Sequence, residues 1–452
     1  MNARVIIAGV AAALATLDPP CRAQQPPPVR PLGPITNVAR DSLASVAAAV
    51  EVAGGRVYVN DIGARRLLLF DSTLDRAVVV ADSAGETSNT YGSLPATLLP
   101  YHGDSALFIT PGALSMEVLT PAGAVARVMA MPPSSGGIPA LIGSIFGTPG
   151  FDARGRLVYF SPIRMVPPPR SPSGDIPRLE PPDSAFVVRF DFATRTLDTA
   201  AAIRIPKTSV AVSRDDQGRF RISMMAFPPR TVDDWAVTSD GALAVVRGQD
   251  YHVDWLGADG SWTSTPRMPY AWERLSDDEK TALIDSTAKA MQMMMDSMPA
   301  RMQRASGGAA GPVAASSEAG RGAAAGTAGG GAGGAGMIIM TVPRPGGAGP
   351  GAPSSTSIVP TVVRAELADV PDYRPPFGQG AVRADRDGNL WIRTSKQVDG
   401  RPVYDVVNRN GEITDRVQLR PFRTIAGFGP GVVYMGVRDS TGVTHLERAR
   451  IK

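Results

Sequence analysis

The sequence predicts an all-β protein, a six-bladed β-propeller with one helical insertion. Three observations support this prediction. Glycine (48 residues) and proline (41 residues) are abundant, which favours turns over long helices. A glycine-containing turn recurs along the chain and is followed each time by a short apolar segment. Several of the intervals between these turns match the length of a propeller blade.

The N-terminal segment, residues 1–23, has the pattern of an export signal. Arg4 precedes an apolar run over residues 5–17 that is too short to span a bilayer, and small residues occupy the cleavage position. Lipid attachment at Cys21 is the alternative to cleavage and release. We therefore expect a secreted or periplasmic protein that begins with a flexible, Gln- and Pro-rich leader over residues 24–33.

Charge and cysteine content narrow the classes of function. Cys21 is the only cysteine, so cleavage of the signal leaves no thiol for a disulfide, a nucleophile or a zinc site. The net charge of +4 is small for 452 residues, and no basic cluster is interleaved with aromatic residues. We therefore do not expect nucleic acid as a partner, nor a transmembrane segment once the signal is removed.

The repeated turn defines blades one to four over residues 34–275 and blades five and six over residues 358–452. Successive turn glycines lie 48, 52, 86, 147 and 43 residues apart, and the long intervals indicate insertions. Glycine accepts the positive φ of a tight hairpin, and the apolar run that follows suits a pleated strand. The turn glycines are Gly55, Gly103, Gly155, Gly241, Gly388 and Gly431.

An additional glycine turn at Gly218 leaves the blade count open. It lies only 23 residues before Gly241, which is too close for both to open four-stranded blades. We interpret residues 207–228 as an extended hairpin on blade three, with seven blades as the alternative. The last blade is one strand short, and the segment 34–40 could supply its outer strand and close the ring.

The insertion between blades four and five is predicted to begin with a helix over residues 276–302. Ser276 and Glu279 form the pattern of a capping box, and Pro299 is expected to end the helix near Met298. The apolar residues of this helix follow helical spacing, so we expect them to pack on the propeller. Residues 303–357 are rich in glycine and alanine, and such a composition predicts disorder.

Two segments resemble the six-bladed propellers of the NHL-repeat and TolB-like superfamily. One is Val57–Phe70, with Asp61 and Arg66 around its turn, and the other is Asp385–Ile392. The resemblance spans roughly residues 40–270 and 360–452. It implies the fold and no activity. Some related propellers, the gluconolactonase and paraoxonase types, hold a divalent metal in the central channel, but their ligands do not map onto this chain.

Candidate site residues are few, and no catalytic residue is assigned. The three histidines are not accompanied by a nucleophile elbow. Asp385, Asp387 and Asn389 alternate like the ligands of a calcium loop, although aspartate also favours this turn without a metal. No cofactor is expected, with Ca²⁺ as the alternative. Asp61 and Arg66 are interpreted as an ion pair that holds a turn.

Arg247, Arg393 and His252 are the candidate ligand-binding residues. The two arginines each end a strand and could bind an anionic ligand. Their positions after the turn glycine differ by one, so strand alternation is expected to point them to opposite faces.

The sequence leaves three functions open. The first is a non-enzymatic, exported binding or scaffold module for a protein, peptide or glycan, with loops on one propeller face carrying recognition. The second is a metal-dependent hydrolase or lactonase that uses the central channel and needs at least three convergent ligands. The third is a partner in envelope assembly.

Overall fold

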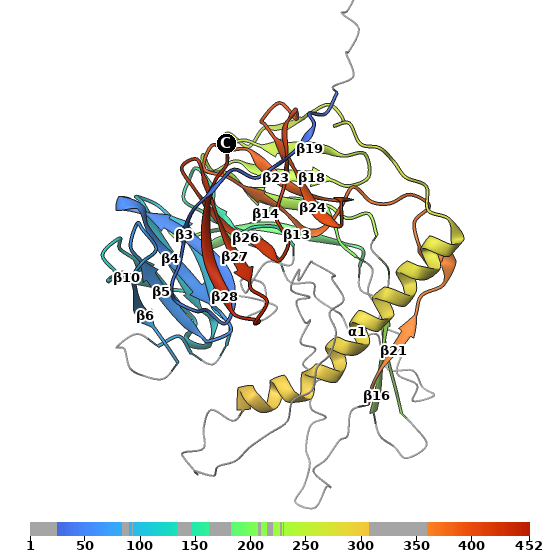
Figure 1. Ribbon diagram of the computed structural model, residues 1–452, viewed down its shortest axis with the longest axis horizontal. Coiled ribbons are helices and arrows are strands. Elements are labelled where there is room, and N and C mark those ends of the chain that lie inside the picture. The colour runs from blue at the N-terminus through green and yellow to red at the C-terminus, as the bar shows by residue number, and fades with distance from the viewer. Residues whose placement is uncertain are drawn as a thin grey trace, which may run out of the picture.

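The computed structural model describes residues 25–83, 90–92, 94–132, 146–161, 182–206, 209–214, 220–226, 228, 230–306 and 359–452. Its described part contains six sheets that form the blades of a β-propeller (Figure 1). Five of them have four antiparallel strands, and one has a fifth strand added at its outer edge. The six-bladed prediction is therefore confirmed, and the seven-bladed alternative is wrong. The predicted signal peptide and most of the segment 303–357 lie outside the described residues.

The first three blades follow one another along the chain. Blade one comprises β3 (Val46–Val52), β4 (Arg56–Asp61), β5 (Arg66–Phe70) and β6 (Ala77–Ala81). Blade two comprises β7 (Thr97–Tyr101), β8 (Ser105–Thr110), β9 (Ser115–Leu119) and β10 (Val125–Ala130). Blade three comprises β11 (Gly150–Phe151), β12 (Leu157–Phe160), β13 (Ser184–Asp191) and β14 (Thr196–Arg204).

The last three blades complete the ring. Blade four comprises β17 (Asp234–Val237), β18 (Leu243–Arg247), β19 (His252–Leu256) and β20 (Trp262–Ser264). Blade five comprises β22 (Phe377–Ala384), β23 (Leu390–Val398), β24 (Arg401–Val407) and β25 (Ile413–Gln418). Blade six comprises β26 (Arg423–Gly429), β27 (Val432–Arg438), β28 (Thr444–Arg450) and, from the N-terminus, β2 (Ile35–Val38). The first strands of neighbouring sheets contact one another, which places them around the axis.

Ring closure combines the two ends of the chain. β2 pairs antiparallel with β28 and gives blade six its outer strand. The segment 24–33, expected to be a flexible leader, instead contains β1 (Val29–Pro31), which pairs parallel with β25 as a fifth strand of blade five. Arg30 donates to Asp415 and, at 2.8 Å, to the carbonyl of Ile451. This strand satisfies backbone groups that an open sheet edge would leave exposed.

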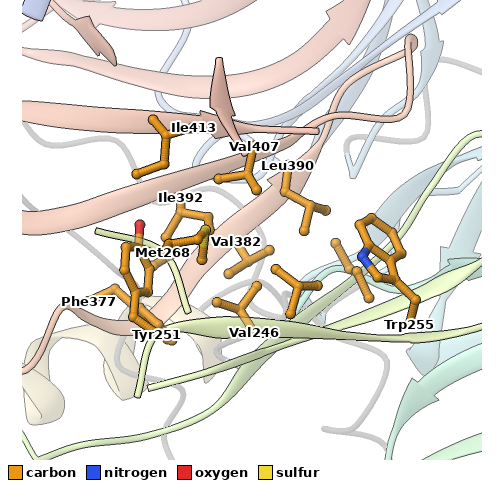
Figure 2. Close-up of a cluster of buried hydrophobic side chains, with 14 of the residues drawn as sticks. Val246, Tyr251, Trp255, Met268, Phe377, Val382, Leu390, Ile392, Val407 and Ile413 are labelled. Atoms are coloured by element: carbon orange, nitrogen blue, oxygen red, sulfur yellow. The ribbon is translucent and has the colours of Figure 1, made fainter. Parts of the chain in front are cut away.

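The cores lie between neighbouring blades, where the faces of two sheets meet. Figure 2 shows the cluster between blades four and five, in which Val246, Tyr251 and Trp255 of blade four face Val382 and other residues of blade five. The Tyr251 hydroxyl also donates to Asp405 Oδ2 across this interface at 2.8 Å. Burial of such apolar surface contributes about 25 cal/mol per Å², so these interfaces hold the ring together.

The inserted segments build a unit outside the ring (Figure 1). β15 (Ser209–Arg214) and β16 (Phe220–Ala226) form a hairpin, and β21 (Val359–Arg364) pairs parallel with β16. The interpretation of residues 207–228 as an extension of blade three is therefore wrong. β21 lies at the C-terminal end of the insertion and completes a sheet that is separate from the blades. Local sequence does not reveal such a pairing between distant segments.

Helix α1 (Asp277–Ser306) packs on this inserted sheet. The predicted capping box is present, because the Ser276 N–H donates to Glu279 Oε2 at 2.9 Å and the Glu279 N–H donates to Ser276 Oγ at 3.3 Å. The helix does not end at Pro299. The helix continues to Ser306, although an internal proline removes one backbone hydrogen bond and its ring crowds the carbonyl four residues earlier.

The apolar face of α1 packs within the insertion and not on the blades, which corrects the sequence expectation. Ile284 forms a buried cluster with Leu275, Ala365 and Val370, which flank or belong to the inserted unit. η5 (Leu367–Asp369) also contacts the helix. In the described part of the chain, no helix has both the length and the apolar character needed to cross a membrane.

Candidate functional site

Two of the candidate binding residues, Arg247 and His252, are brought together in blade four. They lie opposite each other on β18 and β19 and share Asp254 as a partner. Arg247 Nε donates to Asp254 Oδ2 at 2.7 Å, and its Nη1 donates to Asp233 Oδ2 at 2.9 Å. Burial lowers the pKa of Arg247, but hydrogen bonds to these two carboxylates outweigh it, so the net shift is upward. Arg247 is therefore a structural cation.

His252 lies between two carboxylates. Its Nδ1 is 2.7 Å from Asp250 Oδ1, and its Nε2 is 3.2 Å from Asp254 Oδ1. Ser264 Oγ donates to that same Asp254 oxygen at 2.5 Å. The serine thus contacts the carboxylate and not the imidazole, so the group lacks the nucleophile–base contact of a catalytic triad.

Arg393 is far from this cluster in the fold. It lies on β23 opposite Tyr404 and shares a face with Trp391, which packs toward blade six. Arg247 shares its face of β18 with Val245, which packs toward blade three. The two arginines therefore point to different blade interfaces, as strand alternation predicts.

Asp385 is saturated by donors of its own turn. Its Oδ1 accepts the N–H groups of Asp387 at 2.9 Å and Asn389 at 2.8 Å, and its Oδ2 accepts Trp391 Nε1 at 3.1 Å. Asp387 is exposed. These donors occupy the lone pairs that a cation would need. Among the described residues, no three His, Cys, Asp or Glu side chains are grouped to hold a metal.

Asp61 holds a turn in the same way. Its carboxylate accepts the N–H of Ser45 at 2.9 Å and pairs with Arg66 at 2.9 Å, and the Asp61 side chain has no exposed surface. The interpretation of these two residues as a turn-holding pair is confirmed.

A groove lies between blades three and four and the base of the insertion. Its larger hollow, about 550 Å³, is within the range of small-ligand sites. A second hollow of about 330 Å³ shares Arg204, Thr231 and Pro371 with the first and so continues it. The larger hollow is lined by Arg204, Thr231, Gln249, Trp272, Pro371, Asp372 and Tyr373.

Two exposed aromatic side chains dominate the larger hollow. Trp272 is 41% exposed and Tyr373 is 49% exposed. Arg274 forms an isolated antiparallel bridge with Tyr373, which brings the segment that carries Trp272 beside Tyr373, and both aromatic residues line the larger hollow. The two rings therefore line one side of the groove together.

The aromatic wall is held firmly. The Leu275 N–H donates to the Asp372 carbonyl at 2.8 Å, and the Arg374 N–H donates to the Glu273 carbonyl at 2.9 Å. Lys280 of α1 also pairs with the Asp372 side chain at 2.7 Å. The two ends of the insertion are thus tied to each other at the edge of the groove.

The opposite wall rests on the Arg247 cluster. Arg204 Nη1 donates to Gln249 Oε1 at 3.0 Å, and the Arg204 N–H donates to Asp233 Oδ2 at 3.0 Å. Asp233 is the same carboxylate that pairs with Arg247. Arg247, one of the predicted residues, is therefore joined to this wall through Asp233, while the residues that line the groove were missed.

Sequence reasoning missed Trp272 and Tyr373 because about a hundred residues separate them. Their only signal is position, since aromatic residues flank both ends of the insertion. The long interval between Gly241 and Gly388 revealed the insertion but not the pairing of its ends.

Comparisons with known proteins show no family for this chain. No protein-family model and no curated protein matches it. Among solved structures it is similar to an inactive variant of virginiamycin B lyase from Staphylococcus aureus, with 10% identity, coverage of 91% of this chain and 98% of that chain, and a TM-score of 0.34. It is also similar to a luciferin-regenerating enzyme, with 9% identity, coverage of 91% and 96%, and a TM-score of 0.34.

A member of the DUF4221 family from Bacteroides vulgatus is 7% identical, with coverage of 94% of this chain and 96% of that chain and a TM-score of 0.40. Likenesses at this level carry no argument about activity or substrate. Membership of the NHL-repeat or TolB-like group stays a prediction.

Proposed function

We propose that this protein is an exported, secreted or periplasmic binding module, and that its groove binds a glycan. Trp272 and Tyr373 on one wall of the groove carry this proposal. Aromatic faces are electron-rich and attract the C–H groups that line a sugar ring. Export rests on the pattern of residues 1–23 alone.

The groove carries few unpaired charges among the described residues. Asp372 is paired with Lys280, and Asp369 of the second hollow is paired with Arg230 at 3.0 Å. Arg204 is held by the neutral side chain of Gln249 and could donate a further hydrogen bond to a sugar hydroxyl. Gln249 and Thr231 offer both donors and acceptors, which suits hydroxyl groups that donate and accept.

The test is binding of soluble oligosaccharides and of peptides to the full chain, measured by calorimetry. We expect an oligosaccharide to bind and Trp272→Ala to weaken it about tenfold or more, since 1.4 kcal/mol corresponds to tenfold. Trp262→Ala is the matched control, because Trp262 is 45% exposed on the outer strand β20 and does not line the groove.

Two outcomes would contradict the proposal. If Trp272→Ala and Trp262→Ala bind equally well, the ligand does not use the groove. If only peptides bind and Trp272→Ala abolishes that binding, the groove is the site but the glycan assignment is wrong. Tyr373→Phe should retain most of the affinity, whereas Tyr373→Ala should not.

The hydrolase alternative has no observation in its favour among the described residues, since no convergent set of metal ligands lies there. The candidate role in envelope assembly likewise remains a prediction from the sequence.

A further inference from the structure

Three side chains with the chemistry of an oxyanion site line one face of blade five. They are Arg383 on β22, Arg393 on β23 and Tyr404 on β24. Arg393 pairs with Tyr404 in the strand register, and Arg383 pairs with Trp391, two residues before Arg393. Side chains two residues apart on a strand share a face, so all three lie on one face of neighbouring strands.

That face points toward blade six. Val382 and Ile392, which alternate with the arginines, pack toward blade four. Trp391 and Tyr404 belong to the cluster that includes Ile425 of blade six. Arg383 therefore lies on the innermost strand of blade five, on the side that faces blade six.

The two arginines are half-buried, and no carboxylate among the described residues forms an ion pair with either of them. Arg416, also in blade five, pairs with Asp405 at 3.1 Å, whereas none of the ion pairs among the described residues includes Arg383 or Arg393. Two cations on one face of neighbouring strands repel each other, and even partial burial without a counter-charge among the described residues adds to that cost.

The direction of the pKa shift of Arg383 is consistent with a second positive charge on the same face of the sheet. Burial lowers the pKa of Arg383, and the neighbouring charge of Arg393 lowers it further. Tyr404 and Asp234 act on the pKa of Arg383 in the opposite direction. The pKa of Asp234 is itself raised to about 7 by burial, so this carboxyl is largely neutral in mildly acidic solution.

We propose that Arg383, Arg393 and Tyr404 form a binding site for a small oxyanion, a phosphate or a carboxylate, between blades five and six. Guanidinium groups bind such anions with paired, charge-assisted hydrogen bonds, and the tyrosine hydroxyl donates a further one. The anion supplies negative charge that no described residue gives these arginines through an ion pair. This site is separate from the groove and does not depend on the glycan proposal.

The test titrates the full chain with inorganic phosphate and, separately, with malonate, at about pH 6.5 and with ionic strength held constant by chloride. Calorimetry gives affinity and thermal unfolding gives stabilisation. We expect saturable binding of at least one anion. Arg393→Gln should weaken it about tenfold or more, and Tyr404→Phe about threefold. A preference between the two probes identifies the anion class.

Arg154→Gln is the matched control, because Arg154 is exposed on a turn of blade three, and it should bind like the wild type. Without added anion, Arg393→Gln should be at least as stable as the wild type, because it removes one of two repelling charges. Arg383→Lys is the second variant, since it keeps a positive charge but loses the planar pair of donors.

The proposal is overturned if neither anion gives saturable binding above chloride. It is also overturned if Arg393→Gln and Arg383→Lys fold and bind like the wild type. A loss of stability in Arg393→Gln without added anion, with the anion-dependent stabilisation intact, would likewise assign the arginine a structural role.

Discussion

Asp234 makes the stability of the ring depend on pH, because its surroundings favour the protonated carboxyl. Asp234 begins β17, is fully buried, and its Oδ2 accepts the N–H of Val382 in blade five at 2.8 Å. Its Oδ1 is buried, and among the described residues it accepts no hydrogen bond of good geometry. Burial disfavours the ionised form and raises the pKa of this carboxyl from 3.8 to about 7.

A raised pKa means that the folded protein binds this proton more tightly than the unfolded chain does. The stabilisation is fully present below the unfolded pKa of 3.8 and is lost as pH rises through about 7. A shift of about three units at 1.36 kcal/mol per unit corresponds to about 4 kcal/mol, which is an order-of-magnitude figure.

Asp234→Asn isolates this contribution. Asparagine cannot ionise, yet it keeps an oxygen that can accept from Val382, so its stability should lack this pH dependence. Urea unfolding followed by tryptophan fluorescence at about pH 5 and about pH 8 gives both free energies. Only the roughly two pH units between pH 5 and the folded pKa of about 7 contribute, so we expect the variant to gain on the wild type by about 3 kcal/mol between the two conditions.

The matched control is Asp71→Asn. Asp71 is an exposed turn residue whose pKa is lowered, first by its hydrogen bond to Thr73. The Asp71 carboxylate therefore contributes folding stability above the unfolded pKa, and this contribution is lost on acidification, opposite to the effect of Asp234. The reasoning is refuted if the difference in unfolding free energy between the wild type and Asp234→Asn is the same at about pH 5 and about pH 8.

Three further predictions concern the contacts that close and join the ring. Gly427→Ala should destabilise the protein by about 1–3 kcal/mol or more in urea unfolding, because a Cβ there would lie 1.9 Å from the Ala49 carbonyl where blades six and one meet. Gly378→Ala, with nothing within 4 Å of its Cβ, should be nearly neutral, and equal losses would contradict this account. Tyr251→Phe should cost about 1–3 kcal/mol, because it removes the 2.8 Å bond to buried Asp405 and leaves that carboxyl with Arg416; an unchanged midpoint would show that the bond contributes nothing. Arg30→Ala should release β1 from blade five, since it removes the ion pair with Asp415. Limited proteolysis should then cut the segment 25–33 faster, and an unchanged cleavage rate would show that backbone pairing alone holds it.

The local chemistry of the turns was readable from the sequence because it depends on near neighbours. Asp385 and Asp61 bond to donors within a few residues or one strand away, so residue type and spacing predict them. The capping box at Ser276 and the arrangement of Arg247 and Arg393 on opposite faces follow from the same short-range periodicities. The count of six blades follows as well, because each of the six turn glycines joins the first and second strands of one blade.

Only the tertiary structure decided what meets across long stretches of chain. The pairing of β1 with blade five, the separate sheet of β15, β16 and β21, and the apposition of Trp272 with Tyr373 all join segments far apart in sequence. A sequence is equally unable to show that no described carboxylate forms an ion pair with Arg383 or Arg393. Periodicity encodes which face a side chain takes, whereas the partner on that face is set by how the blades close around the axis.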